Sequence, residues 1–199
     1  MSRLLLVRHG QTAWNAERRL QGQFDIPLSR SGIEQVIALR GAVHAFRPDR
    51  AVTSQLARAV ESCVVLGYPH HETDERWQEA DLGDWTGRSS AELQATGDGA
   101  YRRWRAGDLT PPAGESFDHL MDRVYQAIDE LAALDGTTLV VTHGGPIRAA
   151  CAALVGLGPG HVVPVSPGSL TVIDGLREGP ARLSLYNHSA QPSTGEPPD

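Results

Sequence analysis

The sequence predicts an α/β fold in which a mostly parallel central sheet lies between two layers of helices. Two apolar runs without helical periodicity, at 4–7 and 139–142, are typical of strands buried inside a parallel sheet. Segments with apolar residues three and four positions apart alternate with strand-like segments along the chain. This alternation is typical of a three-layer α/β/α sandwich.

Composition limits the classes of partner. The 199 residues include 18 Lys and Arg against 24 Asp and Glu, a formal net charge of −6. A field of this sign disfavours nucleic acid and acidic membranes, so an anionic substrate needs a local positive pocket. No apolar run approaches the length of a membrane span and no signal segment precedes the first strand, so we expect a cytoplasmic protein. We expect one domain over 1–188 and a disordered tail over 189–199.

The first strand delivers two ionisable side chains to the edge of the sheet. Its apolar run ends at Arg8-His9-Gly10, where glycine stops it abruptly. The polar segment 12–25 is expected to form a loop across this edge. Because ligands of open α/β sheets bind beyond the carboxyl ends of the strands, Arg8 and His9 should face a binding site.

A helix and a short strand should follow this loop. Ser29 is a suitable N-cap, and apolar residues at 36, 39, 43 and 46 form one helical face. Pro48 ends the helix, and 50–53 is predicted as the second strand.

A second helix is predicted to begin near the same edge of the sheet. Ser54 is its expected N-cap, Gly67 is its stop, and Arg58 lies in its first turns. The segment 70–74 is predicted as a third strand.

The middle of the chain, 76–114, reads as an excursion of loops and short helices above the sheet. Repeated glycines and the pair Pro111-Pro112 interrupt any longer element. An amphipathic packing helix follows, with Ser116 before it as the cap, and ends near Gly136.

The second buried strand repeats the arrangement of the first. It ends in His143-Gly144-Gly145, and Pro146 suits the first position of a helix that continues to Gly156. Two further strands are predicted at 169–174 and 182–186.

These elements together predict a phosphate pocket. If the two buried strands are neighbours, His9 and His143 meet at one edge, beside free backbone N–H groups at a helix N-terminus. Arg8 and Arg58 add planar guanidinium groups suited to phosphate oxygens. For an isolated Arg-His-Gly triplet, a structural ion pair beside a buried histidine would be the simpler interpretation.

A set of motifs follows one another in a specific order along the chain. They are Leu-Val-Arg-His-Gly-Gln-Thr-x-x-Asn at 6–15, Leu-Gln-Gly at 20–22, Pro-Leu-Ser-x-x-Gly at 27–32, Thr-Ser-x-Leu-x-Arg-Ala at 53–59, Glu-x-x-x-Gly-x-Trp-x-Gly at 79–87, Gly-Glu-Ser at 114–116 and Val-Thr-His-Gly-Gly at 141–145. Arg-His-Gly alone is a weak signal, whereas the ordered set is specific. The set closely resembles the histidine phosphatase superfamily, also called phosphoglycerate mutase-like, from about residue 3 to at least 155.

The resemblance implies a mechanism. His9 would be the nucleophile, and the phosphoryl group would pass through a phosphohistidine. The side chains that would hold the phosphate oxygens are those of Arg8, Arg58, His143 and Asn15. A protonated His143 would serve best. Glu79 would protonate the leaving alkoxide and then activate the water that hydrolyses the intermediate, and the scheme requires no metal and no cofactor.

The other positions that match pocket residues of the family are Gln21, Gly22 and Gly144. Gln21 could do no more than shape the loop, and Asn15 could equally bond to its own backbone. Ser116 is expected to cap a helix and not to act in catalysis.

A basic cluster in the excursion, Arg102, Arg103 and Arg105 around Trp104, has two interpretations. It could grip an anionic or aromatic part of a substrate, but a solvated basic face is the simpler one. A metal site at His70 and His71 is disfavoured, because adjacent side chains on a strand point to opposite faces.

Hydrolysis is the favoured reaction. Phosphoglycerate mutases of the family carry Glu-Arg-His-Tyr-Gly where this chain has Glu79-Ala80-Asp81-Leu82-Gly83, and the acidic Asp81 disfavours a bound phosphoglycerate. We therefore predict a metal-independent phosphomonoesterase that acts on a small phosphorylated metabolite. The alternatives are a phosphoglycerate-type mutase, a non-catalytic phosphate-binding module and a metal-assisted hydrolase. Family members are often dimers, so a homodimer is a further expectation.

Overall fold

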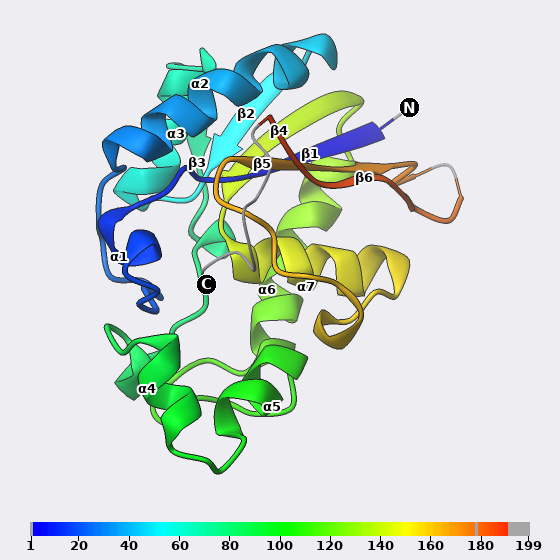
Figure 1. Cartoon of the computed structure of the whole chain (residues 1–199). Coiled ribbons are helices and arrows are strands. Elements are labelled where there is room, and N and C mark those ends of the chain that lie inside the picture. The colour runs from blue at the N-terminus through cyan, green and yellow to red at the C-terminus, as the bar shows by residue number, and fades with distance from the viewer. Residues whose placement is uncertain (1, 178, 191–199) are drawn as a thin grey trace.

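A computed structural model describes residues 2–177 and 179–190 (Figure 1). From residue 191 onward the predicted disordered tail lies outside the described residues. Ser189, expected in that tail, is instead the last residue of strand β6 (Arg182–Ser189), which extends beyond the predicted 182–186. Its backbone pairs with Ser169 on the neighbouring strand, and this pairing explains why it is ordered.

The described strands form one sheet in the order β3-β2-β4-β1-β5-β6. Their bounds are β1 Ser2–Arg8, β2 Arg50–Thr53, β3 Glu72–Thr73, β4 Gly136–Thr142 and β5 Ser169–Asp174, with β6 at the edge. β1, β2, β3 and β4 pair in parallel, whereas β5 runs antiparallel to both of its neighbours. The predicted mostly parallel sheet is therefore confirmed, with β3 shorter than the expected 70–74.

Helices cover both faces of the sheet, as the alternating pattern predicts (Figure 1). α2 (Arg30–Ala45) and α3 (Ala57–Leu66) pack on one face, and α6 (Phe117–Ala132) and α7 (Gly144–Val155) on the other. Successive side chains of β1 point to opposite faces, so Leu5 and Val7 join the first layer and Leu4 and Leu6 the second. All four are fully buried, which is why this strand is apolar without a period.

Serine caps explain where two of these helices begin. The Ser29 hydroxyl accepts a hydrogen bond from the backbone N–H of Gly32, and the Ser116 hydroxyl accepts one from that of His119. The third predicted cap is wrong, because α3 begins at Ala57 with Leu56 at the N-cap position. The hydroxyl of Ser54 is engaged elsewhere, 2.7 Å from Nε2 of His143.

The excursion contains the short elements η1 (Glu75–Trp77), η2 (Gly83–Trp85), α4 (Ser90–Ala95) and α5 (Ala100–Ala106). Figure 1 shows α4 and α5 in green, well away from the sheet. An edge-to-face contact between Trp85 and Trp104, with ring centroids 5.8 Å apart, packs α5 against η2. Outside the excursion there are two further short elements, α1 (Ala13–Ala16), which follows β1, and η3 (Pro159–His161), which follows α7.

Candidate active site

β1 and β4 bring the two predicted histidines to one edge of the sheet. The strands pair in parallel with Arg8 opposite Thr142, so His9 and His143 leave the sheet side by side. The backbone N–H of His9 donates to the carbonyl of Thr142 at 3.0 Å, and the two imidazole centroids lie 5.0 Å apart. The prediction that the two buried strands are neighbours is confirmed.

The imidazole of His9 is held in one orientation. Its Nδ1 lies 2.7 Å from the carbonyl oxygen of Gly10, an acceptor, so Nδ1 must carry the ring proton. Nε2 then carries the lone pair of the ring, which accepts a hydrogen bond from Nε of Arg58 with the two nitrogen atoms 3.3 Å apart. His9 is only 2% exposed but lines the pocket described below. The arrangement presents a neutral, unprotonated Nε2 to that pocket.

Two buried guanidinium groups flank this nitrogen. Arg58 lies in the first turn of α3, and its Nη1 and Nη2 donate to the carbonyls of Phe24 and Gly22 at 2.9 and 2.7 Å. Arg8 ends β1, and its Nη1 donates to the carbonyl of Val165. Backbone carbonyls thus help to position both side chains.

Burial and mutual repulsion set the protonation states of these groups. Burial, followed by the charges of Arg58 and Arg8, lowers the pKa of His9 well below its ordinary value of 6.5. The same causes, with burial first, lower the pKa of His143 well below 6.5. The pKa of each arginine falls to about 10, so both stay charged at neutral pH. His143 is consequently neutral in the free protein, whereas the sequence favoured a protonated His143.

His143 has two distinct ring nitrogens. Its Nε2 is paired with the Ser54 hydroxyl, whereas no described residue is a hydrogen-bond partner of the buried Nδ1. Sequence reasoning missed this role of Ser54, because a serine before a helix is a standard cap signal.

Glu79 is anchored at the start of α7. Its Oε1 accepts hydrogen bonds from the backbone N–H groups of Gly145, at 3.0 Å, and Ala80, at 2.9 Å. The free N–H groups predicted after His143 are therefore used in part by the protein's own carboxylate, a favourable position for a negative charge. Helix α7 begins at Gly144, which makes Pro146 its third residue and not its first.

An arginine absent from the sequence predictions fixes the segment around Glu79. From α6, Arg123 donates to the carbonyls of Arg76, Gln78 and Glu79 at 2.6, 2.9 and 3.1 Å. Its Nε and Nη2 also form a two-pronged ion pair with Glu115, at 2.7 and 2.8 Å. The pair is largely buried, with 16% of the Arg123 and 9% of the Glu115 side chain exposed. Only the tertiary structure connects these residues.

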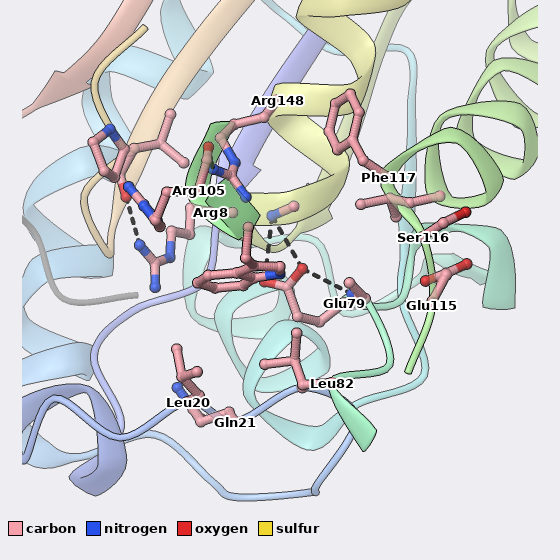
Figure 2. A pocket seen from close by; sticks show the side chains of 18 of the residues that line it. Arg8, Leu20, Gln21, Glu79, Leu82, Arg105, Glu115, Ser116, Phe117 and Arg148 are labelled. Carbon is pink, nitrogen blue, oxygen red and sulfur yellow. Dashed lines mark hydrogen bonds between the residues drawn. The ribbon is translucent and has the colours of Figure 1, made fainter. Parts of the chain in front are cut away.

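These groups line one pocket between the sheet edge and the excursion (Figure 2). Arg8, His9, Arg58 and Glu79 line its polar part. Its remaining wall is largely apolar, formed by Leu20, Leu82, Trp104, Leu109, Phe117, Leu120, Pro164 and Val165. A phosphate at the polar end would leave the bound alcohol against this apolar wall.

The residues that the sequence predicts to bind substrate do not all lie in the pocket. Gln21, Gly22 and Gly144 line the pocket, although Oε1 of Gln21 accepts the Thr12 hydroxyl hydrogen at 2.9 Å. Asn15 is buried but is not a lining residue. Its Oδ1 accepts a hydrogen bond from the backbone N–H of Thr12 at 3.0 Å in a capping box. This is the alternative expected for Asn15, in which its side chain bonds to nearby backbone.

The basic cluster of the excursion divides into two parts. Arg102 and Arg103 are exposed, whereas Trp104 and Arg105 line the pocket together with Arg148, a further residue that the sequence predictions missed. The argument from Asp81 is wrong, because Asp81 is exposed, does not line the pocket and accepts the backbone N–H of Gly83. Within residues 2–177 and 179–190, no group of three or more His, Cys, Asp or Glu residues could hold a metal, and no helix could span a membrane.

Comparison with known families agrees with the motifs. Residues 4–188 match the sequence profile of a family described as the histidine phosphatase superfamily, branch 1. The chain belongs to this superfamily. The resemblance drawn from the motifs is therefore confirmed. The matched region of this histidine phosphatase contains all of the predicted site residues.

Similar proteins cover nearly the whole chain. A glucosyl-3-phosphoglycerate phosphatase of Mycolicibacterium vanbaalenii is 36% identical over 95% of this chain and 96% of its own length. A probable phosphoglycerate mutase of Salmonella paratyphi C is 31% identical over 79% of this chain and 76% of its own length. The solved structure of a mycobacterial glucosyl-3-phosphoglycerate phosphatase with VO3 has a TM-score of 0.86 at 33% identity, covering 93% of this chain and 98% of that one. The predicted three-layer fold is confirmed by this likeness.

Proposed function

We propose that this member of the superfamily hydrolyses the phosphate monoester of a small metabolite by passing the phosphoryl group to Nε2 of His9. The observation that carries the proposal is the orientation of His9. The Gly10 carbonyl fixes the ring proton on Nδ1, and the lowered pKa keeps Nε2 unprotonated at neutral pH. The nucleophile needs no base to activate it.

The charged groups around His9 have the chemistry to bind the phosphoryl group. Arg8 and Arg58 are positioned by hydrogen bonds to backbone carbonyls and are charged at neutral pH. When the Ser54 hydroxyl donates to Nε2 of His143, Nδ1 carries a proton that can be donated to a phosphate oxygen. These donors would stabilise the charge spread over the phosphoryl oxygens in a loose transition state.

Glu79 is the proposed acid and base. The N–H groups of Gly145 and Ala80 lie closest to Oε1, at 3.0 and 2.9 Å, and Gly145 reaches Oε2 only at 3.3 Å, so Oε2 is the oxygen proposed to carry a proton. In the first step Oε2 donates that proton to the leaving alkoxide as the bond from phosphorus to the alcohol oxygen breaks. In the second step the carboxylate removes a proton from water, which attacks phosphorus and releases inorganic phosphate from His9.

We propose hydrolysis and not mutase exchange because of the sequence similarity of this chain to the two kinds of relative. The phosphatase relative is more similar to this chain than the mutase relative is, over a larger share of both chains. The name of that phosphatase describes a phosphorylated sugar-type molecule as its substrate, and we propose a small metabolite of this general type for the present chain.

The test is release of inorganic phosphate from a panel of sugar phosphates, phosphoglycerates, nucleoside monophosphates and phosphoserine in the presence of a chelator. The wild-type protein is measured beside His9→Ala, with His70→Ala as the control because His70 is exposed. We expect release that the chelator does not affect, that His70→Ala retains and that His9→Ala abolishes. Equal release by wild type and His9→Ala would disprove the phosphohistidine mechanism, and exchange only with a bisphosphate primer would identify a mutase.

A further inference from the structure

Asn187 has an unusual backbone conformation at the edge of the sheet. It lies in β6, which pairs only with β5 among the described strands (Figure 1). Between the paired positions Leu170–His188 and Val172–Leu185, β6 contains one residue more than β5, so the strand bulges there. The φ angle of Asn187 is +52°, in the left-handed region that asparagine tolerates better than most residues. The backbone alone does not explain what its side chain does.

The side-chain amide of Asn187 holds the segment between η3 and β5. Its Oδ1 accepts a hydrogen bond from the backbone N–H of Ser166 at 2.6 Å, and its Nδ2 donates to the carbonyl of Pro164 at 3.4 Å. Its own backbone N–H donates to the hydroxyl of Thr171 on β5 at 3.2 Å. The amide thus bonds on both sides of Val165, which is 1% exposed.

The hydrogen bond to Ser166 fixes a peptide group that also contacts Arg8. The N–H of Ser166 and the carbonyl of Val165 belong to the same peptide group, and this carbonyl accepts a hydrogen bond from Nη1 of Arg8. A trans peptide group is planar, with its N–H and C=O on opposite sides. Because Asn187 binds the N–H on one side, the carbonyl is directed at the guanidinium on the other.

The orientation of this peptide group is important because Arg8 is only 3% exposed. Burial lowers its pKa to about 10, even though the charge of Glu79 opposes this shift. The negative end of the Val165 carbonyl favours the charged guanidinium. If the peptide group rotated by half a turn, the N–H of Ser166 would face Arg8, and two donors would oppose each other.

The same segment also holds the main chain at the end of β1. The backbone N–H of Gly168 donates to the carbonyls of His9 at 2.9 Å and Arg8 at 3.2 Å. The backbone and the guanidinium of Arg8 are therefore both bonded to residues 165–168. Asn187 does not line the pocket, so any effect it has on bound phosphate passes through this segment.

We propose that Asn187 is a positioning residue, which locks the peptide group between Val165 and Ser166 so that its carbonyl holds the guanidinium of Arg8 toward the phosphoryl group. The inference rests on the function proposed above and gives the edge strand β6 a role in it. Loss of the amide should let the peptide group rotate and Arg8 move, while the strand keeps its path.

The decisive variant is Asn187→Gly, because glycine adopts a positive φ without strain and the change removes only the side chain. We expect kcat/KM for p-nitrophenyl phosphate to fall by about tenfold or more, since a displacement of about 1 Å at a reacting group can cost about 10²-fold. Arg47→Gly is the matched control, because Arg47 is exposed and has a φ angle of +50°. It should keep the wild-type kcat/KM, and thermal unfolding checks that both variants are folded.

A double-mutant cycle tests whether the loss passes through Arg8. In an Arg8→Met background the peptide group has no guanidinium to hold, so adding Asn187→Gly should change kcat/KM by less than about twofold. A purely structural role for Asn187 would lower kcat/KM by the same factor in both backgrounds.

Amide hydrogen exchange, followed by NMR, tests the peptide group without catalysis. The N–H of Ser166 should exchange about tenfold faster or more in Asn187→Gly than in wild type, because it loses its acceptor. The N–H of Gly168 keeps its acceptors and should exchange as in wild type. Asn187→Asp retains the oxygen that accepts from Ser166 and tolerates the left-handed backbone, so it should keep the slow exchange.

Three results would overturn the inference. They are a wild-type kcat/KM in Asn187→Gly, an equal loss in the Arg8→Met background, and unchanged exchange of the Ser166 N–H. The function proposed above fails separately, because it requires His9-dependent release of phosphate by the wild-type protein. The exchange experiment tests the contact of Asn187 whatever reaction the protein catalyses.

Discussion

The carboxylate of Glu79 and the backbone of Gly145 are joined by a hydrogen bond of 3.0 Å at the first turn of α7. Two residues that are 66 positions apart in the chain thus fix each other across the pocket. The N-terminal end of the helix favours a negative charge at this point. A methyl group on Gly145 would lie 2.2 Å from Oε1, so no larger residue fits while Glu79 keeps its position.

Gly145→Ala should therefore displace Glu79 and lower kcat. A positioned acid or base contributes about 10²- to 10⁴-fold, so we expect a loss of about 10²-fold or more. Gly144→Ala is the matched comparison, because its methyl group would lie 3.8 Å from Arg8 and from Glu79, an ordinary contact. Steady-state hydrolysis rates measure both. A smaller loss in Gly145→Ala than in Gly144→Ala would contradict the role of this hydrogen bond.

The role of Glu79 as an acid predicts a dependence on the leaving group. Glu79→Gln removes the proton that the leaving alkoxide needs, so hydrolysis of an alkyl phosphate should fall by about 10²- to 10⁴-fold. For p-nitrophenyl phosphate the first-step loss should be much smaller, because its leaving group departs without protonation. Burst kinetics with this ester can show the first step separately. Equal first-step losses for the two esters would argue against the assignment.

The buried histidines predict how stability changes with pH. In the unfolded chain His9 and His143 take up protons near pH 6.5, whereas in the fold their pKa values lie well below this. Below pH 6.5 the unfolded state binds more protons, so the free energy of unfolding falls as the pH falls. Each histidine contributes a slope of up to about 1.4 kcal/mol per pH unit, and above pH 6.5 neither contributes.

Urea unfolding at a series of pH values between 5 and 8 measures this effect. Because carboxylates also contribute, the informative quantity is the difference between wild type and His9→Ala. The variant should have a shallower slope below pH 6.5 and the same slope above it. Parallel curves across the whole range would show that His9 is protonated in the folded protein.

The Arg123–Glu115 pair should be important for both stability and activity. Arg123→Met would leave the largely buried Glu115 carboxylate without its partner and free the carbonyls around Glu79. Loss of one partner of a buried pair costs about 3 kcal/mol or more. Urea unfolding measures this loss, and kcat reports the position of Glu79. Arg30→Met, which breaks an exposed ion pair with Glu34, is the control and should unfold as wild type does.

The sequence was sufficient to predict the layers of the fold and the side chains that meet at the edge of the sheet. The apolar runs in β1 and β4 identify both strands, and parallel pairing then places Arg8, His9 and His143 at one edge. Capping rules located α2 and α6 correctly because those serines bond within their own turns. The same rule failed at Ser54, whose hydroxyl bonds to His143, 89 positions away.

The missed residues all act over long distances in the sequence. Nothing near Arg123 indicates that it bonds to the carbonyls around Glu79, 44 to 47 positions earlier. Arg148 had a weak signal, since it is a charged residue within the apolar helical segment 147–154. Distinguishing Arg105 from the exposed Arg102 and Arg103 required the orientation of α5, which a short helix between glycines does not reveal.

The backbone that follows His9 lies directly against the first turn of α2. A methyl group on Gly10 would lie 2.3 Å from the carbonyl oxygen of Gly32, and one on Gly32 would lie 2.1 Å from that of Gln11. The Gly10 carbonyl that orients the imidazole is therefore braced by main chain on main chain, without an intervening side chain that could change rotamer. Because this contact has no room for a side chain on either glycine, any larger residue at either position must shift the backbone that orients the His9 ring.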